Sequence, residues 1–191
     1  MTQLVLTAIG DDRPGLVSAL ARAVANEGGN WLESQMGRLG GKFAGIVLVD
    51  APEDRLDSLV AGVQALSAEH LLDVSVTRAD GTPIVSGTRL ALHLLGHDSP
   101  GIVREVSSVL ASKGVTIDEL STCTMHAPMG DGVLFEADAV VRLPETLSAN
   151  ELQAALESIA AELMVDLDLS QPEATAPSAN DSRSPGSRWF G

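Results

Sequence analysis

The sequence predicts an α+β protein built from two copies of one βαββαβ unit. The stretch 4–17 aligns without a gap to 90–103, and the match continues to Gly28 and Gly114 at the same offset of 86 residues. Each copy also shows strand-like apolar runs and helical periodicity in the order strand, helix, strand, strand, helix, strand. A period this long that occurs twice indicates a duplicated domain and not a solenoid.

The first strand of copy one is predicted at about 4–9 and the first helix directly after the following turn. Pro14 suits the first turn of this helix, where its missing N–H is harmless, and in copy two Ser99 is a good N-cap before Pro100. Helical spacing predicts a buried face made of Leu16, Val17, Leu20 and Val24, and in copy two of Ile102, Val103, Val106 and Leu110.

Two strands follow in copy one, at about 31–39 and 43–49, and they flank Gly40-Gly41, which is a strong hairpin signal. Copy two has a longer turn here, 128–132. Second helices and short closing strands complete the units, the strands at about 72–77 and 165–169. This order is that of the ferredoxin-like sandwich, a four-stranded antiparallel sheet with two helices on one face.

The domain boundaries follow from composition. We expect a first domain at 1–80, a linker at 81–88 that holds Gly, Pro and Ser, and a second domain at 89–170. The tail 171–191 is rich in Pro, Ser, Ala and Asn, so it buries too little apolar surface to order itself and is predicted to be disordered.

Charge and composition argue against a nucleic-acid-binding protein and against a membrane protein. Twenty-six acidic residues face 12 basic ones, a formal net charge of −14, so the chain repels phosphate backbones and we expect no direct nucleic-acid partner. Aromatic residues make up 3%, too few for base stacking. One cysteine, Cys123, fits a reducing compartment, and no apolar run reaches the roughly 18 residues of a membrane span. We therefore expect a soluble cytoplasmic protein without a membrane partner.

The turn after the first strand reads Gly-Asp-Asp-Arg-Pro-Gly at 10–15 and Gly-His-Asp-Ser-Pro-Gly at 96–101. A tight turn explains the glycines and prolines. It does not explain Asp12 and Asp98. An aspartate there can cap the helix. It can also face a ligand ammonium while free helix N–H groups receive a ligand carboxylate. Chemistry alone leaves both alternatives open.

These two Asp-x-Pro-Gly turns, each before an amphipathic helix in a βαββαβ unit, resemble those of ACT domains, and the resemblance covers about residues 3–170. It implies regulatory modules that often bind amino acids where copies pair, and hence a possible homo-oligomer. It also implies contacts from a polar residue in the first turn and one at the start of the second strand. The implied ligand-binding residues are Asp12, Gly15 and Asn30 in copy one and Asp98, Gly101 and Thr116 in copy two.

Three stretches, 39–49, 120–129 and 162–166, resemble the glycine cleavage system transcriptional repressor family more closely. The resemblance implies a stand-alone pair of ACT domains that restrains a transcription activator of the glycine cleavage genes by protein contact, with glycine as the small amino acid that signals. The alternative is an ACT-type regulatory subunit of a separate metabolic enzyme.

No catalytic constellation is visible, so we predict a protein that is not an enzyme and that has no metal site and no cofactor. The four histidines are scattered without metal-ligand spacing. Cys123 lies on a predicted strand with no base placed beside it, which favours a buried small hydrophobic residue over a nucleophile.

Overall fold

The computed structural model describes residues 1–79, 86–127 and 132–172. It divides into two compact units, Met1–Pro83 and Ile84–Gly191, called unit 1 and unit 2 below. The division falls within the predicted linker 81–88, of which 81–85 lie outside the described residues. The same holds for 128–131 of the long turn and for 173–191 of the tail predicted to be disordered.

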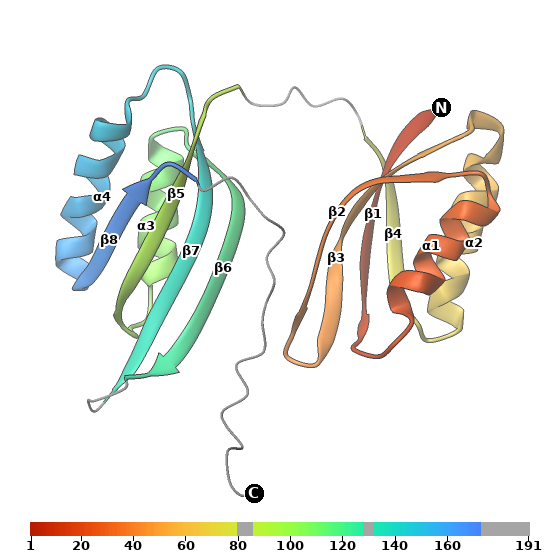
Figure 1. Cartoon of the computed structure of the whole chain (residues 1–191), viewed down its shortest axis with the longest axis horizontal. Coiled ribbons are helices and arrows are strands. Elements are labelled where there is room, and N and C mark those ends of the chain that lie inside the picture. Colours follow the sequence, from red (N-terminus) through yellow and green to blue (C-terminus); the bar gives the residue numbers. More distant parts are fainter. Residues whose placement is uncertain (80–85, 128–131, 173–191) are drawn as a thin grey trace, which may run out of the picture. The chain divides into compact units, whose positions relative to one another are not determined.

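Unit 1 has the predicted order of elements, with a short 3₁₀ turn before its second helix. The elements are β1 (Thr2–Asp11), α1 (Leu16–Asn26), β2 (Asn30–Leu39), β3 (Lys42–Ala51), the 3₁₀ turn (Glu53–Arg55), α2 (Leu56–Ala68) and β4 (Asp73–Arg78). All strand pairs are antiparallel, in the order β2-β3-β1-β4. Helices α1 and α2 cover one face of this sheet (Figure 1).

Unit 2 repeats the architecture. Its elements are β5 (Thr88–His97), α3 (Ile102–Ser112), β6 (Thr116–His126), β7 (Val133–Leu143), α4 (Ala149–Leu163) and β8 (Val165–Ser170). The antiparallel sheet has the order β6-β7-β5-β8, and α3 and α4 cover one face (Figure 1). Two ferredoxin-like βαββαβ domains, and with them the α+β fold class, are confirmed. No helix in the described part of the chain is long and apolar enough to cross a membrane.

Each core forms because alternate strand residues point toward the helices. In β1 the buried residues are Leu4, Leu6 and Ala8, and in β3 they are Val47, Val49 and Ala51. On the first helix of each unit one predicted core residue is wrong, since Val17 and Val103 are each 45% exposed. One residue advances a helix by about 100°, which turns these valines away from the row that starts at Leu16 or Ile102.

Helices α1 and α3 begin later than the sequence predicts. Gly15 and Gly101 precede them in the left-handed conformation, with φ of 97° and 105°, and neither helix start has a side-chain cap. Pro14 therefore lies before α1, and Ser99 does not cap α3. Glycine carries the chain into the helix because it reaches this backbone conformation without strain.

Gly10 and Gly96 are required by a close approach of backbone. A Cβ on Gly10 would lie 2.3 Å from the carbonyl oxygen of Leu71, just before β4. A Cβ on Gly96 would lie 2.6 Å from Val165 Cγ1 and 2.9 Å from the carbonyl oxygen of Met164, at the start of β8. The glycine that opens each turn is thus explained by packing alone.

We predict that Gly10→Ala destabilises unit 1 by about 1–3 kcal/mol, because the new methyl meets fixed backbone and not a flexible side chain. Chemical denaturation followed by circular dichroism measures this. Gly62→Ala in α2 is the matched control, since a Cβ there meets nothing within 4 Å. It should be neutral or stabilise the helix by up to about 1 kcal/mol. Equal stability of the Gly10→Ala variant and the wild type would contradict the packing argument.

Candidate functional site

The turn between β1 and α1 is held against the β2–β3 hairpin. The backbone N–H of Asp12 donates to the carbonyl of Gly41 at 3.0 Å. In unit 2 the N–H of Asp98 makes the corresponding bond to the carbonyl of Val133 at 2.8 Å. The backbone of each aspartate therefore anchors its turn to the neighbouring hairpin.

The Asp12 carboxylate pairs with Arg38 and does not cap α1. Its Oδ2 lies 3.3 Å from Arg38 Nη1, with the aspartate side chain 34% exposed and the arginine side chain 71% exposed. The residue before α1 is Gly15, and no side chain bonds the helix start. Of the two roles that the sequence leaves open for Asp12, capping is therefore wrong.

Asp12 and Arg38 lie beside a surface hollow of about 450 Å³. Its lining residues come from the turn, the first turn of α1 and the hairpin strands: Asp12, Arg13, Pro14, Gly15, Leu16, Val17, Ser18, Arg38 and Phe43. The lining combines apolar side chains, one carboxylate, two guanidinium groups and the N-terminus of a helix, which carries partial positive charge. The exposed Val17 belongs to this lining.

The other cations of this region are engaged elsewhere. Arg13 also lines the hollow, but its guanidinium donates to the carbonyl of His70. Lys42 donates to the Asp11 carboxylate, and this hydrogen bond, followed by the lysine charge, lowers the pKa of Asp11. Arg38 is thus the cation that faces Asp12.

Asn30 does not join Asp12 in this hollow, although the sequence predicts that both contact one amino acid. Asn30 begins β2 and pairs with Asp50, whereas the far end of β3 pairs with Asp11, next to Asp12. A strand of this length spans roughly 30 Å. Within one unit the two residues therefore cannot touch the same small molecule, and a ligand that contacts both would have to take them from two paired copies.

The turn of unit 2 lacks the two arginines of the turn of unit 1. Asp98 and Gly101 keep their places, but Ser99 stands where unit 1 has Arg13. Thr124 pairs with Phe135 as Arg38 pairs with Phe43, so threonine replaces the arginine that faces the carboxylate. Thr116, like Asn30, starts a strand at the opposite end of the sheet. Among the described residues, the aspartate of this turn contacts a guanidinium in unit 1 and not in unit 2.

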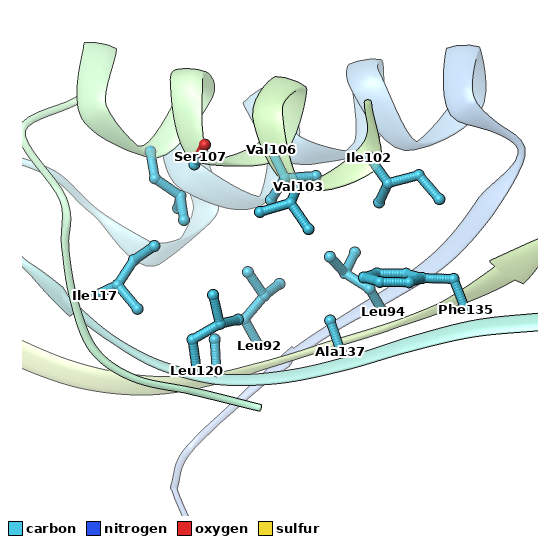
Figure 2. Close-up of a pocket in the computed structure, with 12 residues that line it drawn as sticks. Leu92, Leu94, Ile102, Val103, Val106, Ser107, Ile117, Leu120, Phe135 and Ala137 are labelled. Carbon is cyan, nitrogen blue, oxygen red and sulfur yellow. The ribbon is translucent and has the colours of Figure 1, made fainter. Parts of the chain in front are cut away.

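A second hollow lies in unit 2 between α3 and the sheet, and Figure 2 shows its walls. Apart from Ser107, every lining residue is apolar, including Leu92, Val103, Ile117 and Phe135. The Ser107 hydroxyl donates to the carbonyl of Arg104 at 3.1 Å. The space is only about 30 Å³, which is the size of one water, so this hollow suits no polar ligand.

A family model described as ACT domain matches residues 2–77. Unit 1 of the chain is an ACT domain. The chain is 23% identical over 163 residues to the glycine cleavage system transcriptional repressor of Escherichia coli (strain K12), covering 84% of this chain and 85% of that one. It is also 29% identical to phosphoserine phosphatase SerB2 of Mycobacterium tuberculosis, of which it spans only 39%.

Two solved structures share the fold of this ACT-domain protein over most of its length. An unknown protein from Galdieria sulphuraria is 34% identical, with a TM-score of 0.79, over 90% of this chain and 99% of that one. A protein assigned as a glycine cleavage system transcriptional repressor is 19% identical, with a TM-score of 0.69, over 88% and 96%. The duplicated fold thus occurs in other proteins of similar length.

Sequence reasoning missed Arg38. A signal was available, because the hairpin at Gly40-Gly41 returns the chain beside β1, so residues that flank the hairpin approach the Asp12 turn. Recognising this requires knowing that β1 is the neighbour of β3, which a hairpin signal does not provide.

The prediction that Cys123 is buried is wrong, because this residue lies on the face of the unit 2 sheet that the helices do not cover. Cys123 is exposed and not buried. Strand alternation places it on the same face as Glu136, its partner on β7. On the neighbouring strand, His93 pairs with Asp138. Residues that are scattered in the sequence therefore meet on one surface.

Proposed function

We propose that this ACT-domain protein is a cytoplasmic regulator that binds a small amino acid at the Asp12–Arg38 hollow of unit 1 and passes the result to a partner protein. Glycine is the first candidate ligand, and the partner is a transcription activator of glycine cleavage genes. The observation that carries the proposal is the pairing of Asp12 and Arg38 beside the uncapped start of α1.

This arrangement complements a zwitterion. An amino acid aligned against the Asp12–Arg38 pair brings its ammonium to the carboxylate and its own carboxylate to the guanidinium. Arginine binds a carboxylate with two parallel N–H donors, which fixes orientation as well as charge. The helix start adds partial positive charge on the same side. Both charged ends of the ligand are thus satisfied within one turn and one strand.

The proposed partner rests on the kinship with the repressor of Escherichia coli, which covers most of both chains. The charge of this chain fits a mechanism through protein contact, because a net charge of −14 disfavours the approach of DNA. The alternative, a regulatory subunit of a separate metabolic enzyme, uses the same ligand site and differs only in the partner.

We predict that Asp12→Asn and Arg38→Gln each weaken binding of the amino acid roughly tenfold to a hundredfold, because each removes a charge-assisted contact of about 1.5–3 kcal/mol. A thermal-shift screen of the twenty amino acids identifies the ligand, since a ligand that binds the folded state raises its stability. Calorimetric titration with that ligand then measures the affinities of the variants.

Asp98→Asn is the matched control for this prediction, because its turn has the same backbone but no facing arginine. It should bind as the wild type does. Both unit 1 variants should stay folded, since an exposed ion pair contributes at most about 1 kcal/mol. Wild-type affinity in Asp12→Asn and Arg38→Gln, or an equal loss in Asp98→Asn, would remove the ligand site from unit 1.

A second prediction concerns DNA. The purified chain should not shift a fragment from upstream of the glycine cleavage genes at physiological salt, because its acidic surface releases no counterions from the phosphates. An electrophoretic mobility assay measures this, with an unrelated fragment as the control. A sequence-selective, salt-sensitive shift without any added protein would contradict the proposed mechanism.

A third prediction identifies the partner. Tagged wild-type chain and Arg38→Gln are used to capture proteins from lysate with and without the ligand, followed by mass spectrometry. A transcription activator whose capture responds to the ligand in wild type but not in Arg38→Gln is expected. A metabolic enzyme captured in the same ligand-dependent way would replace the repressor role with that of a regulatory subunit.

A further inference from the structure

The face of the unit 2 sheet that α3 and α4 do not cover, called the open face below, carries several carboxylates (Figure 1). Glu136 and Asp138 lie on β7, and Asp166 and Asp168 lie on the edge strand β8. Strand alternation puts all four on the open face, because the residues between them pack under the helices. The Asp138 side chain is 68% exposed, and both aspartates of β8 are exposed. The open face therefore presents accessible negative charge.

The cations of the open face balance little of this charge. In the part of the chain that the structure describes, His93 is the ion-pair partner of both carboxylates on β7, and no ion pair reaches those on β8. The two arginines of this face, Arg89 and Arg142, both pair with Asp118 toward the other end of the sheet. Even a charged imidazole would balance only one of the four carboxylates.

The fold does not require these carboxylates, because unit 1 builds the same sheet with fewer of them. At the positions of Glu136 and Asp138 unit 1 has Ala44 and Ile46, which pair with the central strand in the same register. On this face β4 has one aspartate where β8 has two. The added charge therefore distinguishes the open face of unit 2 from that of unit 1.

Three apolar side chains lie beside the carboxylates on the open face. Leu134 on β7 pairs with Met125 on β6, and Leu95 on β5 pairs with Glu136. Met125 is 38% exposed, and the two leucines are half-buried. We call Leu95, Met125 and Leu134 the apolar patch. A ligand that complements this face combines positive charge with a large apolar side chain.

The chain itself contains a segment of that chemistry. Within the stretch that follows β8, residues 183–190 read Arg-Ser-Pro-Gly-Ser-Arg-Trp-Phe. This segment has two arginines, two aromatic residues and no acidic residue. Its composition predicts too little apolar surface to order itself, and segments of this kind order on surfaces that complement them.

The position of the segment along the chain favours the open face of unit 2. Arg183 is 13 residues beyond Ser170, the last residue of β8. A flexible chain of that length spans about 20 Å on average. Neighbouring strands are about 4.8 Å apart, so β7 lies roughly 10 Å across the sheet from β8. A short linker gives an effective concentration on the order of millimolar, so ion pairs that are individually weak are sufficient.

We propose that segment 183–190 docks on the open face of unit 2, with Arg183 and Arg188 against the carboxylates of β7 and β8 and with Trp189 over the apolar patch. Arginine binds carboxylates through a planar fork of N–H donors, and a methionine thioether packs favourably against an aromatic ring. The docked segment competes with any basic segment of another protein for the same face.

The test uses the full chain with a bimane fluorophore on Cys123, the single cysteine, which is exposed on the open face. Desolvation, followed by the hydrogen bond to Glu136, raises the pKa of the Cys123 thiol, so the label is attached at mildly alkaline pH. Tryptophan quenches bimane on contact. We expect Trp189→Leu to raise the bimane intensity at least twofold. Trp31→Phe in unit 1, the other tryptophan, should leave the intensity unchanged.

Charge reversal tests the proposed ion pairs. Asp138→Lys combined with Asp168→Lys should relieve the quenching as fully as Trp189→Leu does, because the face then repels the arginines. Glu157→Lys combined with Glu162→Lys is the matched control, since both glutamates are exposed on α4. This control has the same change in net charge and should keep the quenching. NaCl at about 1 M, where the Debye length is about 3 Å, should relieve at least half of it.

Reversal on the segment gives a second, independent readout. Arg183→Glu combined with Arg188→Glu should relieve the quenching without any change in the sheet, and joining both double reversals in one chain should restore at least half of it. Equal bimane intensity in wild type and Trp189→Leu, or quenching that neither double reversal changes, would overturn the proposal. Quenching that falls on dilution would assign the face to the segment of a second copy and overturn the contact within one chain.

Discussion

The register between each central strand and its long neighbour is the interaction on which the contacts of Asp12 in unit 1 and of His93 in unit 2 depend. Because β1 pairs with β3 from Thr2–Ala51 to Asp11–Lys42, the hairpin is brought against the turn that carries Asp12. The same pairing of β5 with β7 places His93 opposite Asp138. A slip of one residue would move every side chain of a strand to the other face and dissolve both arrangements. Burial of alternate apolar residues under the helices is what prevents that slip.

The duplication shows which features of the turn the fold requires and which side chains it leaves free to differ. Both units keep the glycine that packs against the backbone leading into the last strand, which is Gly10 or Gly96. Both also keep the left-handed glycine before the first helix and the aspartate whose N–H anchors the turn. These shared features are structural. Among the differences are side chains that the fold leaves at least partly exposed: Arg38 against Thr124 at the turn, and Thr7 against His93 on the open face. Sequence change at such positions alters binding with little effect on stability, so the two units can acquire separate ligands.

A regulator that binds a small amino acid must convert a weak local signal into a change that a partner detects. The Asp12 turn is suited to this because it joins three elements: β1, the start of α1 and the β2–β3 hairpin. A ligand that engages Asp12 and Arg38 together would favour one arrangement of hairpin and helix over others, and a partner that contacts either element would sense the difference. In the proposed mechanism, the net charge of −14 would favour contact with basic partner proteins over contact with DNA.

The sequence by itself determined the duplication, the order of elements and the turn, since internal alignment and periodicity report on local backbone preference and on which faces are buried. It also singled out Asp12. It could not say that Asn30 lies at the opposite end of the sheet from Asp12, that Arg38 faces Asp12, or that Cys123 is exposed beside Glu136. These facts depend on which strands are neighbours and in what register, because contacts between residues far apart along the chain are set by sheet pairing. Local pattern determined the elements, and tertiary pairing decided which side chains meet.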